Sequence, residues 1–271
     1  MITRILHVSD LHVGARDDTM LEAGLRSLVE RCRPELLVAS GDLTHRGRRA
    51  QHERAAALLR SLGVPVLAVP GNHDIPYTFP ARFTRPWREF DRCWETTRPV
   101  HESDAALVVG LNSVRPWRHQ SGGLSDAALA AAERRLREAP AGVLRMVVLH
   151  HQLINAPWRT RKRPLARRYH VLERLVAAGA ELIVGGHVHQ AAVAERHEFE
   201  VSDGELRGAV VSTTPGLGQP RPRRHGEARG ALDYRVEDAR ITVDTHIWRD
   251  GGFGLTATRT FPRGREPLTP A

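Results

Sequence analysis

The stretch VPVLAVPGNHD, residues 64–74, decides how this chain is interpreted. Its first half is a short apolar run rich in valine, which is typical of a buried strand. Its second half places four residues of turn and ligand type in a row, Gly71, Asn72, His73 and Asp74, and packing alone does not explain them. In α/β sheets, ligands bind beyond the carboxyl ends of the strands. The stretch therefore predicts a strand that ends in a polar site.

The same pattern, an apolar run followed by ligand-type side chains, occurs four more times. The polar blocks that follow the other runs are Asp10-Leu11-His12, Gly41-Asp42, His150-His151 and Gly186-His187-Val188-His189. One such block alone is weak evidence, because Asp and His often follow strands. All five occur in order after predicted strands, so chance is a poor explanation of the set. We expect one metal site with the ligands Asp10, His12, Asp42, Asn72, His150, His187 and His189.

Short apolar runs alternate with helical patterns along the chain, which indicates a layered α/β fold. Strands are predicted at 5–8, 36–39, 64–69, 106–111, 146–149 and 182–184, and helices at 21–32, 50–62, 126–138 and 169–178. Later strands near 191–199, 206–213, 232–236 and 240–248 look antiparallel and are expected to form a second sheet. The sum is a two-sheet β-sandwich flanked by helices.

The length of 271 residues suits one large domain, which we place at residues 1–250. Residues 75–103 are rich in proline and aromatic side chains, and we expect a cap-like insertion near the site. Residues 251–271 are rich in proline, glycine and arginine, and are expected to form a loose tail.

The net charge of +9 would fit an anionic partner such as nucleic acid. Lys162 is, however, the only lysine among 40 basic residues, and such a preference for arginine is typical of a GC-rich genome. Charge alone therefore does not decide the substrate.

Cysteine usage and the amino terminus indicate the compartment. Cys32 and Cys93 lie far apart and outside any CxxC motif, so we expect no disulfide framework. Cys32 lies on the apolar face of a predicted helix and is interpreted as a buried structural thiol. Neither a signal peptide nor an apolar run of the ~20 residues that a membrane helix needs is found. A cytoplasmic protein outside the membrane is expected.

The predicted ligand set indicates which ions it would bind. It combines two carboxylates, one amide oxygen and four imidazoles without a thiolate, which excludes a structural zinc site. Such ligands suit Mn, Fe or Zn, and Mg less well. Two ions bridged by one carboxylate need about this many ligands.

The blocks VSDLH, GDL, PGNHD, LHH and GGHVH resemble those of the calcineurin-like metallophosphoesterase superfamily, from residue 5 to about 248. The resemblance implies a four-layer αββα fold and a binuclear site in which a hydroxide between the ions is the nucleophile. It implies that Asp10, His12 and His189 hold one metal, that Asn72, His150 and His187 hold the other, and that Asp42 bridges them. It also implies that His73 contacts the phosphate and stabilises the transition state or protonates the leaving oxygen. Asp74 is expected to orient His73 as part of the catalytic set, and His151 is expected to face the substrate together with Asn72 and His73.

Within the superfamily, residues 111–136, LNSVRPWRHQSGGLSDAALAAAERRL, resemble the class III cyclic-nucleotide phosphodiesterases, in which a loop ending in Gly-x-Leu precedes a helix. The chain departs from that group at residues 150–153, where it carries HHQL instead of the frequent HHPP. We expect hydrolysis of a small phosphodiester, a cyclic nucleotide or a glycerophosphodiester.

Three alternatives stay open. A nuclease similar to repair exonucleases would use the basic loop 159–168 to bind a phosphate backbone. A phosphomonoesterase would use the same core. A scaffold that has lost its metals is disfavoured by the intact ligand set. The sequence also leaves a homodimer open.

Overall fold

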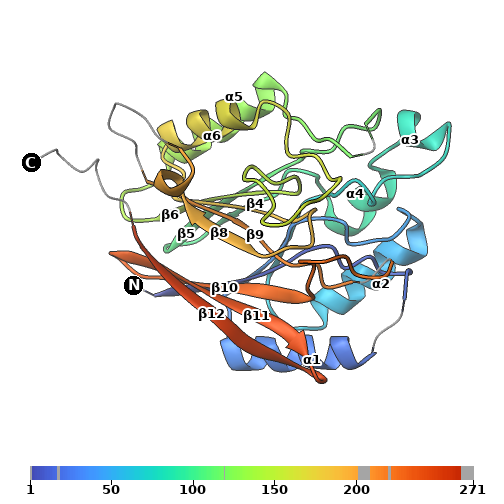
Figure 1. Ribbon diagram of the computed structural model, residues 1–271. Coiled ribbons are helices and arrows are strands. Elements are labelled where there is room, and N and C mark those ends of the chain that lie inside the picture. Colours follow the sequence, from blue (N-terminus) through green and yellow to red (C-terminus); the bar gives the residue numbers. More distant parts are fainter. Residues whose placement is uncertain (1, 17–18, 119, 201–207, 219–220, 264–271) are drawn as a thin grey trace, which may run out of the picture.

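The computed structural model describes residues 2–16, 19–118, 120–200, 208–218 and 221–263. Two six-stranded sheets face each other, with helices α5 and α6 outside one sheet and α1 outside the other (Figure 1). This arrangement confirms the prediction of a four-layer αββα fold. The helices are α1 Thr19–Cys32, α2 Arg49–Arg60, α3 Ala81–Thr84, α4 Arg88–Trp94, α5 Asp126–Glu138 and α6 Arg168–Ala177, and η1 Arg196–Glu198 is a short 3-10 turn.

The first sheet has the order β12-β11-β10-β1-β2-β3. Its strands are β1 Thr3–Val8, β2 Leu36–Ala39, β3 Val66–Ala68, β10 Gly230–Val236, β11 Arg240–Arg249 and β12 Gly252–Pro262. The second sheet has the order β4-β5-β6-β7-β9-β8. Its strands are β4 Val100–Glu102, β5 Ala106–Leu111, β6 Leu144–Leu149, β7 Leu182–Gly185, β8 Ala192–Glu195 and β9 Val210–Thr213.

Each sheet contains a parallel centre, and this centre positions the functional loops. Strands β1, β2 and β3 are parallel in the first sheet, and β5, β6, β7 and β9 are parallel in the second. Val38, Val148 and Val184 are fully buried in the cluster between the sheets. Helices cover the outer faces, so these strands are buried on both sides and their sequences are continuous apolar runs. The carboxyl ends of the parallel strands carry the predicted ligand blocks.

The helices begin and end close to the predicted positions for local reasons. Ser125 caps α5, because its hydroxyl accepts a hydrogen bond from the Ala128 amide. Leu25, Leu28 and Val29 of α1 are buried against the outer face of the first sheet, as their helical spacing predicts.

The later strands do not form a sheet of their own, and this prediction is wrong. Strands β8 and β9 complete the second sheet, whereas β10 and β11 extend the first, and β9 is parallel to β7. Part of the expected strand at 206–213 lies outside the described residues. Alternating polarity indicates a strand. Both sheets offer the same kind of apolar surface, so this pattern cannot indicate which of the two sheets the strand joins.

The prediction of a loose tail from residue 251 is also wrong for the described residues. Residues 252–262 form β12, which pairs with β11 from Arg249↔Gly252 to Arg240↔Pro262. Asp250 and Gly251 form the two-residue turn, with φ of 49° and 81°. An Asp-Gly pair with positive φ at both positions is typical of a hairpin turn. The remaining tail, residues 264–271, lies outside the described residues.

The region expected to be an irregular cap at 75–103 contains α3, α4 and β4. Helix α4 packs against α2, and Phe90 of α4 is fully buried. Across the described part of the chain, no helix combines the length and the apolar character that crossing a membrane requires.

Candidate metal centre

The seven predicted ligands, which we call the metal centre, lie in loops that follow β1, β2, β3, β6 and β7. Backbone strain marks most of them. Positive φ angles occur at Asp10 (53°), His12 (48°), Asp42 (51°), His187 (73°) and His189 (59°). A residue other than glycine rarely adopts this region, and such residues concentrate at functional sites, where the surroundings hold them in place. The same turns aim several side chains at one point.

The first cluster combines residues from both sheets. His189 Nε2 lies 2.9 Å from Asp10 Oδ1 and 3.2 Å from His12 Nε2. All three side chains are buried, and their ligand atoms lie within 4.8 Å of one another. This is the set that the resemblance implies for one metal.

The second cluster contains Asp42, His150 and His187, with ligand atoms again within 4.8 Å of one another. His150 Nε2 lies 3.2 Å from His187 Nδ1 and 3.2 Å from Asn72 Oδ1. The structure thus brings the residues expected around the other metal together.

Asp42 lies between the two clusters. Its Oδ1 lies 3.4 Å from His150 Nε2, and its Oδ2 lies 3.9 Å from His12 Nε2. The carboxylate therefore reaches toward both groups, which is the placement that a bridging ligand requires.

The donor atoms fit divalent cations. Asp10 Oδ1 and Asp42 Oδ2 are buried and form no hydrogen bond to a residue outside the two clusters in the described structure. Buried polar atoms normally have partners, because an unsatisfied one costs about 1–3 kcal/mol. Imidazole nitrogens that approach within 3.2 Å in both clusters also point to a shared positive centre. Oxygen and nitrogen ligands without sulfur suit Mn, Fe or Zn.

Supporting hydrogen bonds fix the orientation of the ligands. His150 Nδ1 donates to the Ser40 carbonyl at 2.8 Å, which leaves Nε2 free to face the cluster. Asp10 Oδ2 accepts from the His187 amide at 2.9 Å and from Ser9 Oγ at 2.8 Å. Such partners set the ring tautomer and the aim of a metal ligand.

The charges of the centre stabilise ionised carboxylates. Burial alone would raise the pKa of Asp10, but the charges of His189 and Lys162 outweigh it, and the pKa lies well below its usual range. Burial would lower the pKa of His150, but Asp42 outweighs burial and raises it to about 9. The carboxylates can therefore bind a cation at neutral pH without first losing a proton.

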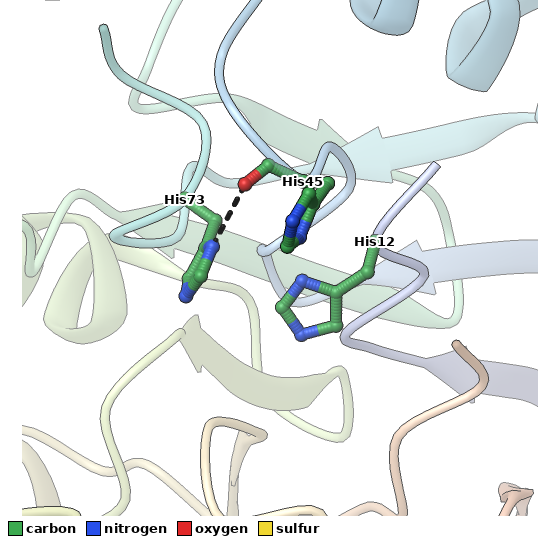
Figure 2. A group of neighbouring side chains, drawn as sticks. All are labelled: His12, His45 and His73. Atoms are coloured by element: carbon green, nitrogen blue, oxygen red, sulfur yellow. Dashed lines mark hydrogen bonds between the residues drawn. The ribbon is translucent and has the colours of Figure 1, made fainter. Parts of the chain in front are cut away.

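His73 lies beside the centre and is more open than the ligands. Figure 2 shows that His12, His45 and His73 point toward one another from three loops. His73 Nδ1 donates to the His45 carbonyl at 2.9 Å. A carbonyl can only accept, so the hydrogen is on Nδ1, and Nε2 is available to a substrate. The Tyr77 hydroxyl lies 2.9 Å from Nδ1 and 3.4 Å from Nε2.

The expectation that Asp74 orients His73 is wrong. The Asp74 carboxylate accepts from the backbone amides of Gly71, Leu43 and Thr44 at 2.8–3.1 Å, and from the Thr44 hydroxyl at 2.9 Å. Its bonds are thus used to tie the loop after β2 to the loop after β3. The His45 carbonyl and Tyr77 orient the His73 ring instead.

His151 does not lie where a substrate contact requires it. Its side chain is 1% exposed, and Nδ1 pairs with Ser113 Oγ at 2.8 Å. Its ring packs against those of His150 and His187, with centroids 5.1 and 4.7 Å away. His151 therefore supports two of the expected ligands rather than facing solvent.

Three further residues adjoin the metal centre, and the sequence analysis did not place them there. His45 and Tyr77 contact His73, and Lys162 Nζ lies 4.0 Å from Asp10 Oδ1 and donates to the His187 carbonyl. Lys162 sits in the stretch interpreted as a basic surface loop, but its side chain is 13% exposed. The signal that could have found it is that it is the single lysine of the chain.

Residues 3–191 match the model of the calcineurin-like phosphoesterase family, and the chain belongs to this family. Its curated relatives carry phosphodiesterase names.

The curated relatives are more specific in name but cover the chain only in part. A protein of Synechococcus named "Probable cyclic nucleotide phosphodiesterase" is 28% identical over 56% of this chain and 58% of its own length. One of the same name from Vesicomyosocius okutanii is 26% identical over 71% of this chain and 81% of its own length. The glycerophosphodiester phosphodiesterase of Enterobacter lignolyticus is 27% identical over 50% of this chain and 52% of its own length.

Solved structures agree on the fold. A dimetal phosphatase from Danio rerio superposes with a TM-score of 0.67 at 14% identity, covering 97% of this chain and 99% of its own. A purple acid phosphatase from yellow lupin gives 0.70 at 11% identity, covering 96% of this chain and 53% of its own. At these identities the likeness shows the shared fold alone.

Proposed function

We propose that this protein is a binuclear phosphodiesterase that hydrolyses a small phosphodiester of the cyclic-nucleotide or glycerophosphodiester class. The observation that carries the proposal is Asp42, whose two carboxylate oxygens face two separate ligand clusters. His73 lies beside them with Nε2 available. The substrate class is supported by the names of the relatives, which include both kinds of phosphodiesterase.

In this proposal, Asp10, His12 and His189 hold one ion, Asn72, His150 and His187 hold the other, and Asp42 is shared. When bound, two divalent cations supply an activated water and neutralise the charge of the phosphoryl oxygens. His73 is a partly exposed imidazole outside the two clusters, and its ring centroid lies 4.8 Å from that of His12.

The protein's own side chains contribute to catalysis by positioning the substrate and by protonating an oxygen of its phosphate. His73, held through Nδ1, aims Nε2 at the substrate, and the doubly protonated ring donates from Nε2 to a phosphoryl or leaving oxygen. Tyr77 restricts the rotation of that ring by contacting it from the cap region. Lys162 adds a positive charge next to Asp10.

The basic loop gives little support to the nuclease alternative. Lys162 points inward to the centre, Arg167 donates to Asp126 at 2.8 Å, and Arg168 donates to Asn155 at 2.7 Å. These side chains are therefore engaged within the protein, whereas Arg161 and Arg163 are exposed.

The test is a substrate panel with Mn²⁺-loaded protein: a cyclic nucleotide, glycerophosphocholine, p-nitrophenyl phosphate and a single-stranded oligonucleotide. We expect kcat/KM to be highest for a small diester and activity to disappear on exhaustive chelation. About two ions should be bound per chain. Activity that survives chelation contradicts the metal mechanism.

A variant of the exposed basic loop separates the alternatives. Arg161→Ala combined with Arg163→Ala should leave turnover of the small diester unchanged. Preference for the oligonucleotide, together with its loss in this variant, would instead assign the nuclease function. Preference for p-nitrophenyl phosphate would assign the monoesterase function.

A further inference from the structure

A second group of ligand-type side chains lies away from the metal centre, between α1 and the outer face of the first sheet. It consists of Cys32, Asp233 and His246, which we call the thiol cluster. They come from the last residue of α1, from β10 and from β11, and Figure 1 shows α1 lying beneath these strands. Their exposed fractions are 1%, 0% and 6%, and their ligand atoms lie within 4.8 Å of one another.

His246 is the unexplained member of the thiol cluster. Both of its ring nitrogens are buried without a hydrogen-bond partner in the described structure. A neutral imidazole carries one donor and one acceptor, and leaving both unpaired in the interior is unfavourable. A buried thiol that donates to Asp233 would explain Cys32, but it leaves His246 unsatisfied.

The strand geometry directs His246 and Asp233 to the same face. Leu232 and Tyr234 of β10 point into the core between the sheets, so Asp233 points outward to α1. His246 pairs with Ala231, two residues before Asp233 in the same register. The β11–β12 pairing shifts register between Thr245 and His246. Such a bulge re-aims a side chain and is frequent beside functional sites.

Arg4 supports Asp233 without using all of its acceptor capacity. Arg4 Nε and Nη2 donate to Asp233 Oδ2 at 2.9 and 2.7 Å, and Nε also lies 3.2 Å from Oδ1. A carboxylate offers about four lone-pair positions, so Oδ1 can still bind a cation. A hydrogen-bonded partner of this kind is usual behind a metal-ligating carboxylate.

We propose that the thiol cluster binds one thiophilic divalent cation of the zinc type, with Cys32, Asp233 and His246 as its protein ligands. Sulfur, nitrogen and carboxylate oxygen are the ligand atoms that zinc takes in proteins. The Cys32 thiol gives up its proton on binding, and a water completes the coordination. The ion joins the end of α1 to β10 and β11 and gives one of the two ring nitrogens of His246 a partner.

Cobalt distinguishes this site from the metal centre. A Co²⁺ ion bound by a thiolate gives an intense near-ultraviolet charge-transfer band, whereas the metal centre contains only oxygen and nitrogen ligands. Titration of the full chain with Co²⁺ should produce this band with one thiolate-bound ion per chain. Adding Zn²⁺ should displace the ion and abolish the band.

The two cysteines provide a matched pair of variants. Cys32→Ser should abolish the band and retain activity on bis-p-nitrophenyl phosphate. Cys93→Ser should keep the band, because Cys93 lies on α4, outside the thiol cluster. Cys93 is the only other cysteine, so this variant is the matched control. His246→Gln should weaken Co²⁺ affinity at this site at least about tenfold, since even a residue that only supports a ligand changes affinity by that factor.

The absence of a thiolate band in the folded wild-type chain, or a band that follows Cys93, overturns the proposal. Circular dichroism of each variant shows that it is folded. If Cys32→Ser fails to fold, the loss of the band in folded His246→Gln supports the site, and an unchanged band and affinity in that variant overturns it.

Discussion

The metal centre and the thiol cluster hold similar side chains on different kinds of backbone. The centre is built on loops, and five of its predicted ligands have positive φ. The thiol cluster is built on the end of a helix and on two antiparallel strands. Strained turns bring many ligands together from short stretches of chain. They need supporting hydrogen bonds, such as those of Asp74, to keep their shape. Regular elements keep their shape through their own backbone hydrogen bonds, but each contributes only one ligand.

The largest effect is expected from Asp42→Asn, which tests whether the two ligand clusters share one carboxylate. Removing the charge should lower turnover by roughly 10³-fold or more and reduce the metal content, because both clusters lose a ligand. Turnover and metal per chain are measured together, with the exposed Asp104→Asn as a control that should behave as wild type. The Co²⁺–thiolate band should persist in Asp42→Asn, since Cys32 lies on α1. Its loss would show that the two regions are not independent.

His73→Ala should lower kcat by about 10²–10³-fold while metal content stays at two ions, because His73 acts on the phosphate and not on the metals. Tyr77→Phe should lower kcat by about tenfold or less, since it removes one hydrogen bond to the ring. Metal analysis beside steady-state kinetics checks both. If His73→Ala lost metal in proportion to its loss of kcat, His73 would be one of the ligands. The distinction between the ligand clusters and His73 would then be wrong.

His7 tests whether a regular strand beneath the centre carries the pH sensitivity of folding. It lies on β1 with Nε2 2.8 Å from Ser40 Oγ and Nδ1 3.1 Å from the Tyr234 hydroxyl. Burial lowers the pKa of His7 to about 3, with an opposing contribution from Asp10. Between pH 6.5 and about 3 the unfolded chain therefore binds a proton that the folded chain does not, so stability falls as the pH decreases.

The corresponding variant is His7→Gln. Between pH 7 and pH 5 the free energy of unfolding of wild type should fall by about 2 kcal/mol more than that of the variant, because each pKa unit corresponds to about 1.4 kcal/mol. Urea unfolding of both proteins at the two pH values measures the difference. Parallel pH dependence in the two proteins would rule out His7 as its source.

The strand-end blocks made the metal centre predictable. The block GNHD places the ligand Asn72 and the neighbouring His73 within five residues of one strand, and GGHVH places two ligands there. The parallel centres bring the blocks together. Glycine next to a ligand adds to the signal, because a Cβ on Gly71 would lie 2.1 Å from the Asp42 amide nitrogen.

The remaining features depend on contacts between distant segments. The inward direction of Lys162, the use of Asp74 as a loop tie and the burial of His151 follow from packing that no local pattern encodes. The thiol cluster could not be predicted either, since Cys32, Asp233 and His246 come from three separate elements. The hairpin turn at Asp250-Gly251, in contrast, was readable from its two residues and was missed.

The inward position of the single lysine gives the protein a built-in chemical reporter. Lys162 carries the only side-chain amine of the chain, and that amine lies beside Asp10. An amine-acylating reagent therefore has one side-chain target, and its rate of reaction measures how accessible the metal centre is. Ligands that fill the centre can be ranked by how far they slow this reaction, without an assay for the product of catalysis.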